Sequence, residues 1–434
     1  MDSKQNSILA LDDDCLFTVF TYLNILDLME TEKVCQRFKS IAEMVYKTKH
    51  KLDYEVLLEE KLKKAERTKQ IEDNFTLEDV ENISQRLGPY VHTLNACSLY
   101  FLDSYCTLHD ILKDFSNLRH LNLTKFKLNQ RDFQLFNRIF VNLRVIQLED
   151  CDVTDDIEVC LREAKHLESL DLSCNTKITG KCLTVLRNIK QINLDFCSKL
   201  ELSHFTEFCE LNQGLQGIKI DSFFLTNDFF SVIATHLQNL ERVRIVDLNT
   251  NQNIDLAILG DLPGLKVLEF LNFQEFNMDS CLLKLAVWNT LEHLSICSSH
   301  FTQRLLRALC SFTKLKVLKI KWNQEINDAN LIQMSLSENF QSLQEFEIYY
   351  CHQITDNGIV EFIRNCRELT QVELDLEYNM ICNVIKRILP FLNERKSILT
   401  IIVSKRLLKK IPLHMRDQMC NPKIKVIDSC GQSF

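Results

Sequence analysis

Glycine is scarce in this chain, with only eight residues among 434. The pair Gly260-x-x-x-Gly264 lacks both the spacing and the Lys-Ser/Thr pair of a phosphate-binding loop. The chain also contains no G-x-S-x-G nucleophile elbow and no H-E-x-x-H zinc motif. The sequence therefore offers no candidate catalytic residue and no motif for a cofactor.

Long hydrophobic runs and an excess of positive charge are lacking as well. No stretch of about 18 apolar residues could span a bilayer, and the N-terminus runs into the acidic Asp12–Asp14 without a signal-peptide pattern. The formal net charge of −8 argues against a general nucleic-acid or membrane binder, because such proteins are normally basic. We expect a protein of the cytoplasm or of the nucleus.

The 18 cysteines show no metal-binding spacing. No two stand three positions apart, so no C-x-x-C half-site exists, and the histidines show no zinc spacing. Cys151, Cys197 and Cys351 occupy one place in the repeat described next, where Asn175 and Asn323 stand in other copies. We interpret them as turn residues whose side chains satisfy buried backbone groups, rather than as a metal or redox centre. Free, reduced thiols are expected.

What the chain has in abundance is a unit of about 25 residues built on Leu-x-x-Leu-x-Leu. A degenerate copy, Val91-x-x-Leu94-x-Ala96, precedes the clear ones. The clear copies begin at Leu118, Leu143, Leu167, Ile189, Leu215, Leu240, Leu265, Leu291, Leu315, Leu343, Leu369 and Ile398. This period and anchor predict leucine-rich repeats over residues 90–404, with about 13 strands.

Each unit predicts a strand, a turn and a helix. Several expected helices follow a threonine, whose hydroxyl can accept a hydrogen bond from an orphan backbone N–H. They span residues 155–164, 180–187, 303–310 and 356–366 and follow Thr154, Thr179, Thr302 and Thr355. Consecutive strands should pair in parallel through right-handed crossovers. We therefore predict an α/β, right-handed solenoid with parallel strands on a concave face and helices on a convex face.

A short helical pattern precedes the repeats. Apolar residues recur at helical spacing over residues 15–23, Asp27-Leu28 follows, and then comes Val34-Cys35-Gln36-Arg37-Phe38. In order and spacing this segment resembles an F-box, whose usual pattern is Leu-Pro, a helix ending in Tyr-Leu, Asp-Leu and Val-Cys-x-x-Trp. The stretch 348–359 resembles the cysteine-containing leucine-rich repeats that are common in F-box proteins.

The resemblance implies a three-helix F-box over residues 8–50, with two departures from the usual pattern. Asp12 stands where proline is usual, which we expect to loosen the turn into the first helix and so to weaken adaptor binding slightly. Phe38 replaces tryptophan and keeps an aromatic side chain in the core. The adaptor-binding residues that the resemblance implies are Leu11, Cys15, Leu16, Val19, Phe20, Leu23, Leu28, Val34, Cys35 and Phe38.

A protein of this family is expected to be the substrate receptor of a Skp–cullin–F-box ubiquitin ligase. The resemblance implies that the F-box binds the Skp adaptor, and through it cullin and a RING subunit. The repeats would hold a protein substrate, with or without a phosphate group, and catalysis would lie in other subunits. Two alternatives remain: an F-box protein without ligase activity, and a leucine-rich repeat scaffold whose N-terminal helices are only a cap.

Two further segments flank the repeats. Residues 51–89 are expected to form a charged helical linker and an N-terminal cap, with Leu77–Leu87 after Thr76 as the cap helix. Residues 405–434 are expected to form a C-terminal cap and tail, whose basic residues 405–410 belong to a solvated helix.

Residues between the anchors should point to the concave face, because strand side chains alternate. That face turns basic near the middle of the repeats and again further on, before it becomes acidic. The candidate substrate-binding residues are Lys219, Arg242, Arg244, Lys319, Lys321 and Tyr349. The alternative is that exposed strand positions are polar anyway and that neighbouring charges neutralise each other.

Overall fold

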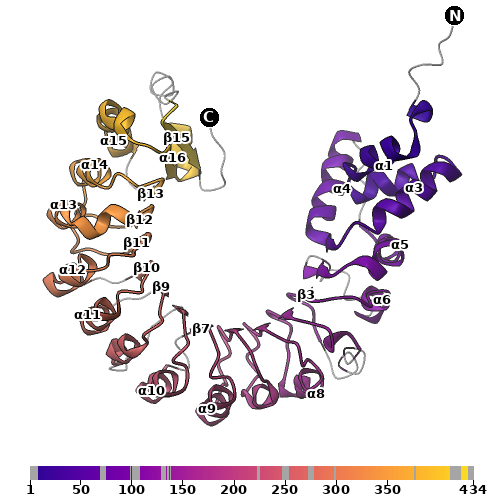
Figure 1. Cartoon of the computed structure of the whole chain (residues 1–434), viewed down its shortest axis with the longest axis horizontal. Coiled ribbons are helices and arrows are strands. Elements are labelled where there is room, and N and C mark those ends of the chain that lie inside the picture. Colours follow the sequence, from indigo (N-terminus) through magenta and orange to yellow (C-terminus); the bar gives the residue numbers. More distant parts are fainter. Residues whose placement is uncertain are drawn as a thin grey trace, which may run out of the picture. The chain divides into compact units, whose positions relative to one another are not determined.

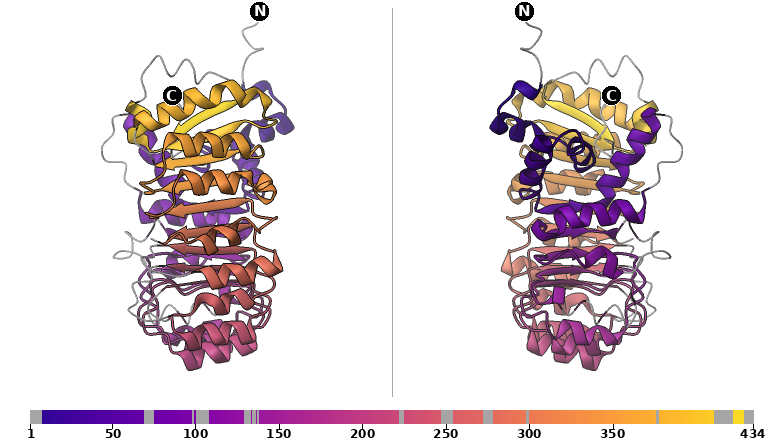
Figure 2. Two further views of the ribbon diagram at one scale, coloured as in Figure 1. Left: turned by 90° about the vertical axis from the view of Figure 1, so that its left-hand side faces the viewer. Right: turned by 90° about the vertical axis from the view of Figure 1, so that its right-hand side faces the viewer.

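The computed structural model describes most of the chain and divides it into two compact units, Met1–Leu211 and Asn212–Phe434. The described residues are 8–68, 75–97, 99, 108–128, 133, 136, 138–221, 225–246, 254–271, 278–297, 300–375, 378–410 and 422–428. In each unit, parallel strands lie side by side, and helices pack on one side of them (Figures 1 and 2).

The first unit begins with helices that are close in sequence and pack on one another. A 3-10 helix, η1 (Ile8–Ala10), precedes α1 (Asp13–Thr21), α2 (Ile25–Thr31) and α3 (Gln36–Tyr46). Both α1 and α2 pack against α3. This is the three-helix arrangement that the resemblance implied.

The rest of the first unit alternates strands with helical segments. Its strands pair in parallel in sequence order. The strands are β1 (Lys51–Asp53), β2 (Thr93–Asn95), β3 (His120–Asn122), β4 (Val145–Gln147), β5 (Ser169–Asp171) and β6 (Gln191–Asn193). The helical segments are α4 (Tyr54–Thr68), α5 (Leu77–Leu87), η2 (Gly88–Tyr90), α6 (Leu108–Leu112), η4 (Asp155–Ile157), α8 (Glu158–Leu161), η5 (Lys181–Val185) and α9 (Leu202–Leu211).

The second unit continues the same pattern with longer strands, again parallel and in sequence order. They are β7 (Gly217–Asp221), β8 (Arg242–Val246), β9 (Val267–Leu271), β10 (His293–Cys297), β11 (Val317–Lys321), β12 (Glu345–Tyr349), β13 (Gln371–Asp375), β14 (Leu399–Val403) and β15 (Ile424–Asp428). The helical segments are α10 (Asn227–His236), η7 (Leu256–Asp261), α11 (Asp279–Trp288), α12 (Gln303–Leu309), α13 (Asp328–Leu336), η8 (Glu338–Ser342), α14 (Asp356–Asn365), α15 (Tyr378–Ile388), η9 (Leu389–Glu394) and α16 (Lys405–Lys410).

The predicted anchor leucines form the core in register. Leu121, Ile146, Leu170 and Ile192 are partners on neighbouring strands, and all four are buried. Strands β2–β14 are the 13 predicted between residues 90 and 404. The described residues contain two more, β1 and β15, in the segments expected to be linker and tail. Both bury apolar side chains against a neighbouring strand, as terminal repeats of an array need.

The turn residues form the predicted buried ladder. Asn175 is fully buried, and its amide donates to the carbonyl oxygens of Leu148 at 2.7 Å and Leu172 at 2.8 Å. Its side-chain oxygen accepts from the backbone N–H of Cys151 at 3.1 Å and of Val153 at 2.9 Å. The Cys151 thiol in turn bonds the carbonyl of the preceding repeat, Leu123, at 2.9 Å. The structural interpretation of these positions is therefore confirmed.

One predicted helix cap is wrong. Thr302 and Thr355 cap α12 and α14 as expected, but Thr179 does not cap the next segment. The residue before η5 is Gly180, which has the left-handed φ of 93° and makes no side-chain cap. The Thr179 hydroxyl donates instead to Asp155 Oδ2 at 2.8 Å. The acceptor in the preceding repeat thus displaced the local bond that the sequence suggested.

Candidate functional site

Four of the implied adaptor-binding residues build the core of the helical module itself. Leu16, Phe20, Leu28 and Phe38 are each no more than 5% exposed. The rings of Phe20 and Phe38 meet edge to face, with centroids 5.2 Å apart. Phe38 therefore keeps an aromatic core contact, as expected. These side chains are buried within the chain and support the shape of the module.

The other implied residues are on or near the module's surface. Val34 is 65% exposed and Val19 is 42% exposed, whereas core side chains of the same kind are fully buried. Leu11 and Cys15 are exposed as well, and Leu23 and Cys35 are half-buried. The prediction missed four further exposed large apolar side chains, Ile8, Leu9, Tyr22 and Met44, which lie outside the helical stripe that guided it. We call Ile8, Leu9, Leu11, Cys15, Val19, Tyr22 and Val34 the exposed F-box residues.

Asp12 does not loosen the start of the first helix. It is the N-cap of α1, and its carboxylate accepts a hydrogen bond from the Cys15 backbone N–H at 2.8 Å. That bond holds the pKa of the Asp12 carboxyl below its usual value. The expectation of a looser turn is wrong, because a capping carboxylate replaces the proline that pre-sets a helix start.

Arg37 of α3 fixes the segment that carries several exposed F-box residues. Its guanidinium contacts Asp13 Oδ1 at 2.7 Å and the carbonyl oxygens of Leu9 at 3.0 Å and Leu11 at 2.6 Å. A single planar donor thereby ties η1 and the start of α1 to α3. The apolar side chains at the N-terminus of the module are thus held against a folded support.

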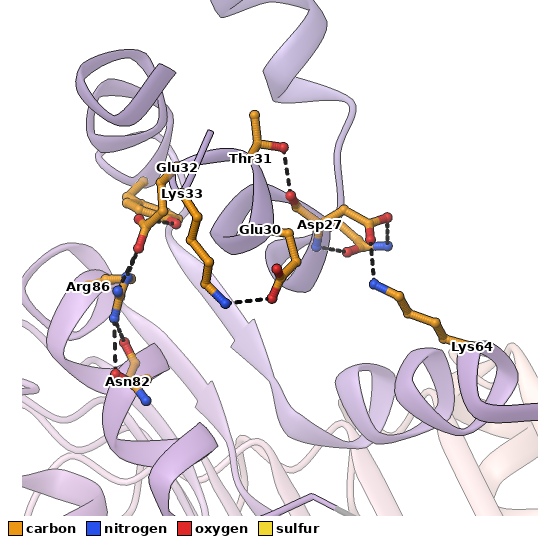
Figure 3. Close-up of polar contacts among 10 residues, drawn as sticks. Asp27, Glu30, Thr31, Glu32, Lys33, Lys64, Asn82 and Arg86 are labelled. Carbon is orange, nitrogen blue, oxygen red and sulfur yellow. Dashed lines mark hydrogen bonds and ion pairs between the residues drawn. The ribbon is translucent and has the colours of Figure 1, made fainter. Parts of the chain in front are cut away.

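Two ion pairs join the helical module to the following helices (Figure 3). Arg86 of α5 contacts Glu32 at the end of α2, with Nη2 to Oε1 at 2.5 Å and Nε to Oε1 at 2.8 Å. The hydroxyl of Tyr46 donates to the other oxygen of Glu32 at 2.9 Å. Lys64 of α4 reaches Asp27 Oδ1 at 3.3 Å. The module is therefore attached to the start of the repeats by polar side chains as well as by the chain itself.

The first predicted basic group lies on β7 and β8 of the second unit. Lys219 and Arg244 are register partners on these neighbouring strands, and Arg242 is exposed beside them. No ion pair to these three residues is found within the described part of the chain, and Arg244 Nε is buried without a hydrogen bond. Glu269, the register partner of Arg244 on β9, lies 3.2 Å from His293 instead. No ion pair within the described residues therefore neutralises this group.

The second predicted basic group is neutralised within the sheet. Glu347, which is 8% exposed, receives Lys319 Nζ at 3.2 Å and Lys321 Nζ at 2.6 Å from the neighbouring strand β11. Lys319 and Lys321 therefore satisfy a buried carboxylate of β12. For these two residues the alternative holds that neighbouring charges neutralise each other. Tyr349, two positions after Glu347, lies beside Trp322 and Tyr350.

Two other kinds of site are absent from the described residues. No group of three or more His, Cys, Asp or Glu side chains there could hold a metal ion. Within the same residues, no helix has both the length and the apolar character needed to cross a membrane.

Comparisons with known proteins match both parts of the chain. The family model for the F-box domain matches residues 8–50, and the model for the leucine-rich repeat matches residues 163–184. The chain thus contains an F-box domain at residues 8–50 and a leucine-rich repeat at residues 163–184, in line with the resemblance that the sequence showed.

Solved structures resemble the chain more distantly. One is a chain from the crystal structure of the Rad7 and Elc1 complex in yeast, with 13% identity over 88% of this chain and 98% of that one, and a TM-score of 0.36. Another comes from the TLR13–ssRNA13 complex, with 16% identity over 62% of this chain and 47% of that one, and a TM-score of 0.34.

Proposed function

We propose that this protein is the substrate-recognition subunit of a Skp–cullin–F-box ubiquitin ligase. The observation that carries the proposal is a folded F-box with exposed apolar side chains, joined by Glu32–Arg86 to an array of repeats. The exposed F-box residues would bind a Skp-type adaptor, and through it cullin and a RING subunit. The repeats would hold the protein to be ubiquitinated. The chain would act by positioning the substrate, which raises its effective concentration at the conjugating enzyme.

The structure also bears on the alternative that the N-terminal helices are only a cap. The side chains of Val80, Ile83 and Leu87 in α5 are fully buried, and Thr76 and Asp79 form a capping box at its start. Helix α5 and strand β1 therefore cover the first repeat. The preceding three helices are not needed for that role, which supports a separate binding function for them.

The repeats would present the substrate on the strand face. Lys219, Arg242 and Arg244 are candidates for an acidic or phosphorylated segment, because guanidinium groups bind carboxylate and phosphate in a bidentate manner. We also propose that the protein acts in the cytoplasm or the nucleus, where the free thiols of its described cysteines would stay reduced.

Reconstitution with purified components tests the proposal. Wild-type protein should co-purify with a Skp-type adaptor and, when cullin and RING subunit are added, with those as well. Val19→Glu/Val34→Glu places two charges among the exposed F-box residues and should abolish adaptor binding without unfolding the module. Val159→Glu is the matched control, since Val159 is 58% exposed on α8, outside the F-box.

Three outcomes separate the candidates. Adaptor binding by the wild type that the double variant retains would contradict the assigned surface. Adaptor binding without recovery of cullin would favour an F-box protein without ligase activity. Absence of adaptor binding by the wild type would leave a leucine-rich repeat scaffold.

A further inference from the structure

Three aromatic side chains gather at the carboxyl ends of two neighbouring strands in the second unit. Trp322 follows β11, Tyr349 ends β12, and Tyr350 follows it. The rings of Trp322 and Tyr350 stack with centroids 4.1 Å apart and planes 10° apart. Tyr349 meets both at steep angles, 6.1 Å from Trp322 and 4.6 Å from Tyr350. We call these three residues the aromatic cluster.

The aromatic cluster is partly exposed to solvent. Aromatic side chains normally stabilise a folded protein by being buried. Trp322 is 50% exposed and Tyr350 is 39% exposed. Both also have a left-handed backbone, with φ of 56° and 52°. The same place in other repeats holds Lys125, Asp150, Cys174 and Phe196, all at positive φ, so the turn of the repeat itself sets this conformation.

Two carboxylates lie beside the aromatic cluster on the next strand. Tyr349 is the register partner of Asp375 on β13, and Glu347 is the register partner of Glu373. Glu347 is already occupied by Lys319 and Lys321. Glu373 and Asp375 have no ion-pair partner in the described parts of the second unit. Burial raises the pKa of both carboxyl groups, and for Glu373 the nearby Glu347 raises it further.

The charge balance on these strands is negative. Their open face has two ammonium groups, on Lys319 and Lys321, against four carboxylates. The carboxylates belong to Glu345, Glu347, Glu373 and Asp375. A surface that combines half-exposed aromatic rings with desolvated carboxylates fits a cation. Among protein cations, arginine fits best, because its planar guanidinium stacks on an aromatic ring and binds a carboxylate in a bidentate manner.

We propose that the aromatic cluster, with Glu373 and Asp375, binds an arginine side chain in a basic segment of a partner protein. That this partner is a substrate for ubiquitination rests on the proposed function; the arginine site itself does not. The arginine site would be distinct from the basic group at Lys219, Arg242 and Arg244. That basic group suits an acidic partner segment, whereas the arginine site suits a basic one.

The two tryptophans of the chain allow a direct test. Trp288 lies on α11, so Trp288→Phe in the full chain leaves Trp322 as the single tryptophan reporter. Three synthetic peptides of one sequence would be titrated, containing arginine, lysine or the neutral isostere citrulline at the same positions. The arginine peptide should change Trp322 fluorescence saturably, the lysine peptide should bind several-fold more weakly, and the citrulline peptide should not bind.

Variants identify the groups responsible. Glu373→Gln/Asp375→Asn should weaken the arginine peptide about tenfold or more, since charged hydrogen bonds are lost. Tyr350→Ala should weaken it about fivefold by removing one stacked ring. Asp228→Asn/Glu338→Gln removes the same charge elsewhere in the second unit and should leave binding unchanged. In Trp322→Phe, where Trp288 is the reporter, no fluorescence change is expected.

Equal binding of the citrulline peptide, or unchanged affinity in Glu373→Gln/Asp375→Asn, would overturn the proposal. Absence of binding by all three peptides would overturn it too. Adaptor binding measured on the same preparations keeps this result separate from the proposed function. A protein that binds the adaptor but no peptide contradicts only the arginine site, and one that binds the peptide but no adaptor contradicts only the ligase role.

Discussion

Arg86 Nη2 lies 2.5 Å from Glu32 Oε1, and this ion pair joins the cap helix α5 to the end of F-box helix α2 (Figure 3). The Glu32 side chain is 9% exposed and the Arg86 side chain is 30% exposed. Burial by itself would raise the pKa of Glu32, but hydrogen bonds from Arg86 and Tyr46 outweigh it and lower that pKa. The pair therefore favours the ionised carboxylate in the folded state.

Glu32→Gln should lower the free energy of unfolding by about 1–2 kcal/mol at neutral pH, discounted for the partial exposure of Arg86. Because the folded-state pKa of Glu32 is lowered, its contribution is present above its unfolded pKa, roughly 4.3, and is lost as the pH falls through the folded value. Denaturation curves of both proteins at several pH values should converge in acid. Glu30→Gln, in the exposed Lys33 pair, should change little, and a difference that persists at low pH would contradict this account.

Leu16→Ala should destabilise the F-box by about 2–5 kcal/mol, because the side chain is fully buried among the module's own helices. Hydrogen exchange measured by peptide should increase over α1–α3, while strands of the second unit keep their protection, since repeats depend on their neighbours. The exposed Val19→Ala should leave exchange in α1–α3 unchanged. If Leu16→Ala left these helices equally protected, Leu16 would not be a core residue.

Asn175→Ala should be more destabilising than Cys151→Ala. Removal of the Asn175 amide leaves buried carbonyl and N–H groups of two turns without partners, which costs about 1–3 kcal/mol or more. Cys151 supplies only a thiol to the Leu123 and Glu149 carbonyls. Thermal unfolding of the two variants compares them directly, and an equal or reversed order would mean that the ladder depends on the thiols.

Arg242→Glu/Arg244→Glu should remove bound partners that have acidic or phosphorylated segments and should spare the adaptor. The two guanidinium groups and Lys219 have no ion-pair partner within the described strands, so reversing the charge of the two arginines breaks no ion pair there. Affinity capture with quantitative mass spectrometry would compare the variant with the wild type. Arg304→Glu/Arg307→Glu on α12 gives the same charge change on the helical side and serves as the control. Identical partners in all three proteins would show that this group is only solvated surface.

Much of the fold could be predicted because its determinants repeat. The spacing of Leu121, Ile146, Leu170 and Ile192 predicted each strand and its register, since parallel neighbours must stack anchor on anchor to share one core. The cap helix Leu77–Leu87 was likewise fixed by local chemistry, with Thr76 at its start. The Cys and Asn positions at the turns were predictable because every copy leaves the same backbone groups to be satisfied.

Which residues of the candidate sites are exposed or charged depends on contacts between distant parts of the chain, and no local sequence pattern contains those contacts. The helical stripe predicted the same role for Leu16 and Val19, but packing of α1 on α3 buries Leu16 and leaves Val19 exposed. Glu347 neutralises Lys319 and Lys321 from a strand 26 to 28 positions further along the chain, and Trp322 stacks on Tyr350 across the same pair of repeats.

The sequence by itself determined that this chain stacks leucine-rich repeats behind an F-box, because hydrophobic period and turn chemistry act within each copy. Only the tertiary structure decided which charges stay free and which rings stay exposed. Those outcomes depend on rotamers and register between copies, where an acceptor in a neighbouring repeat can displace the local one. Thr179, bonded to Asp155 while Gly180 turns the chain, shows this competition in a single residue.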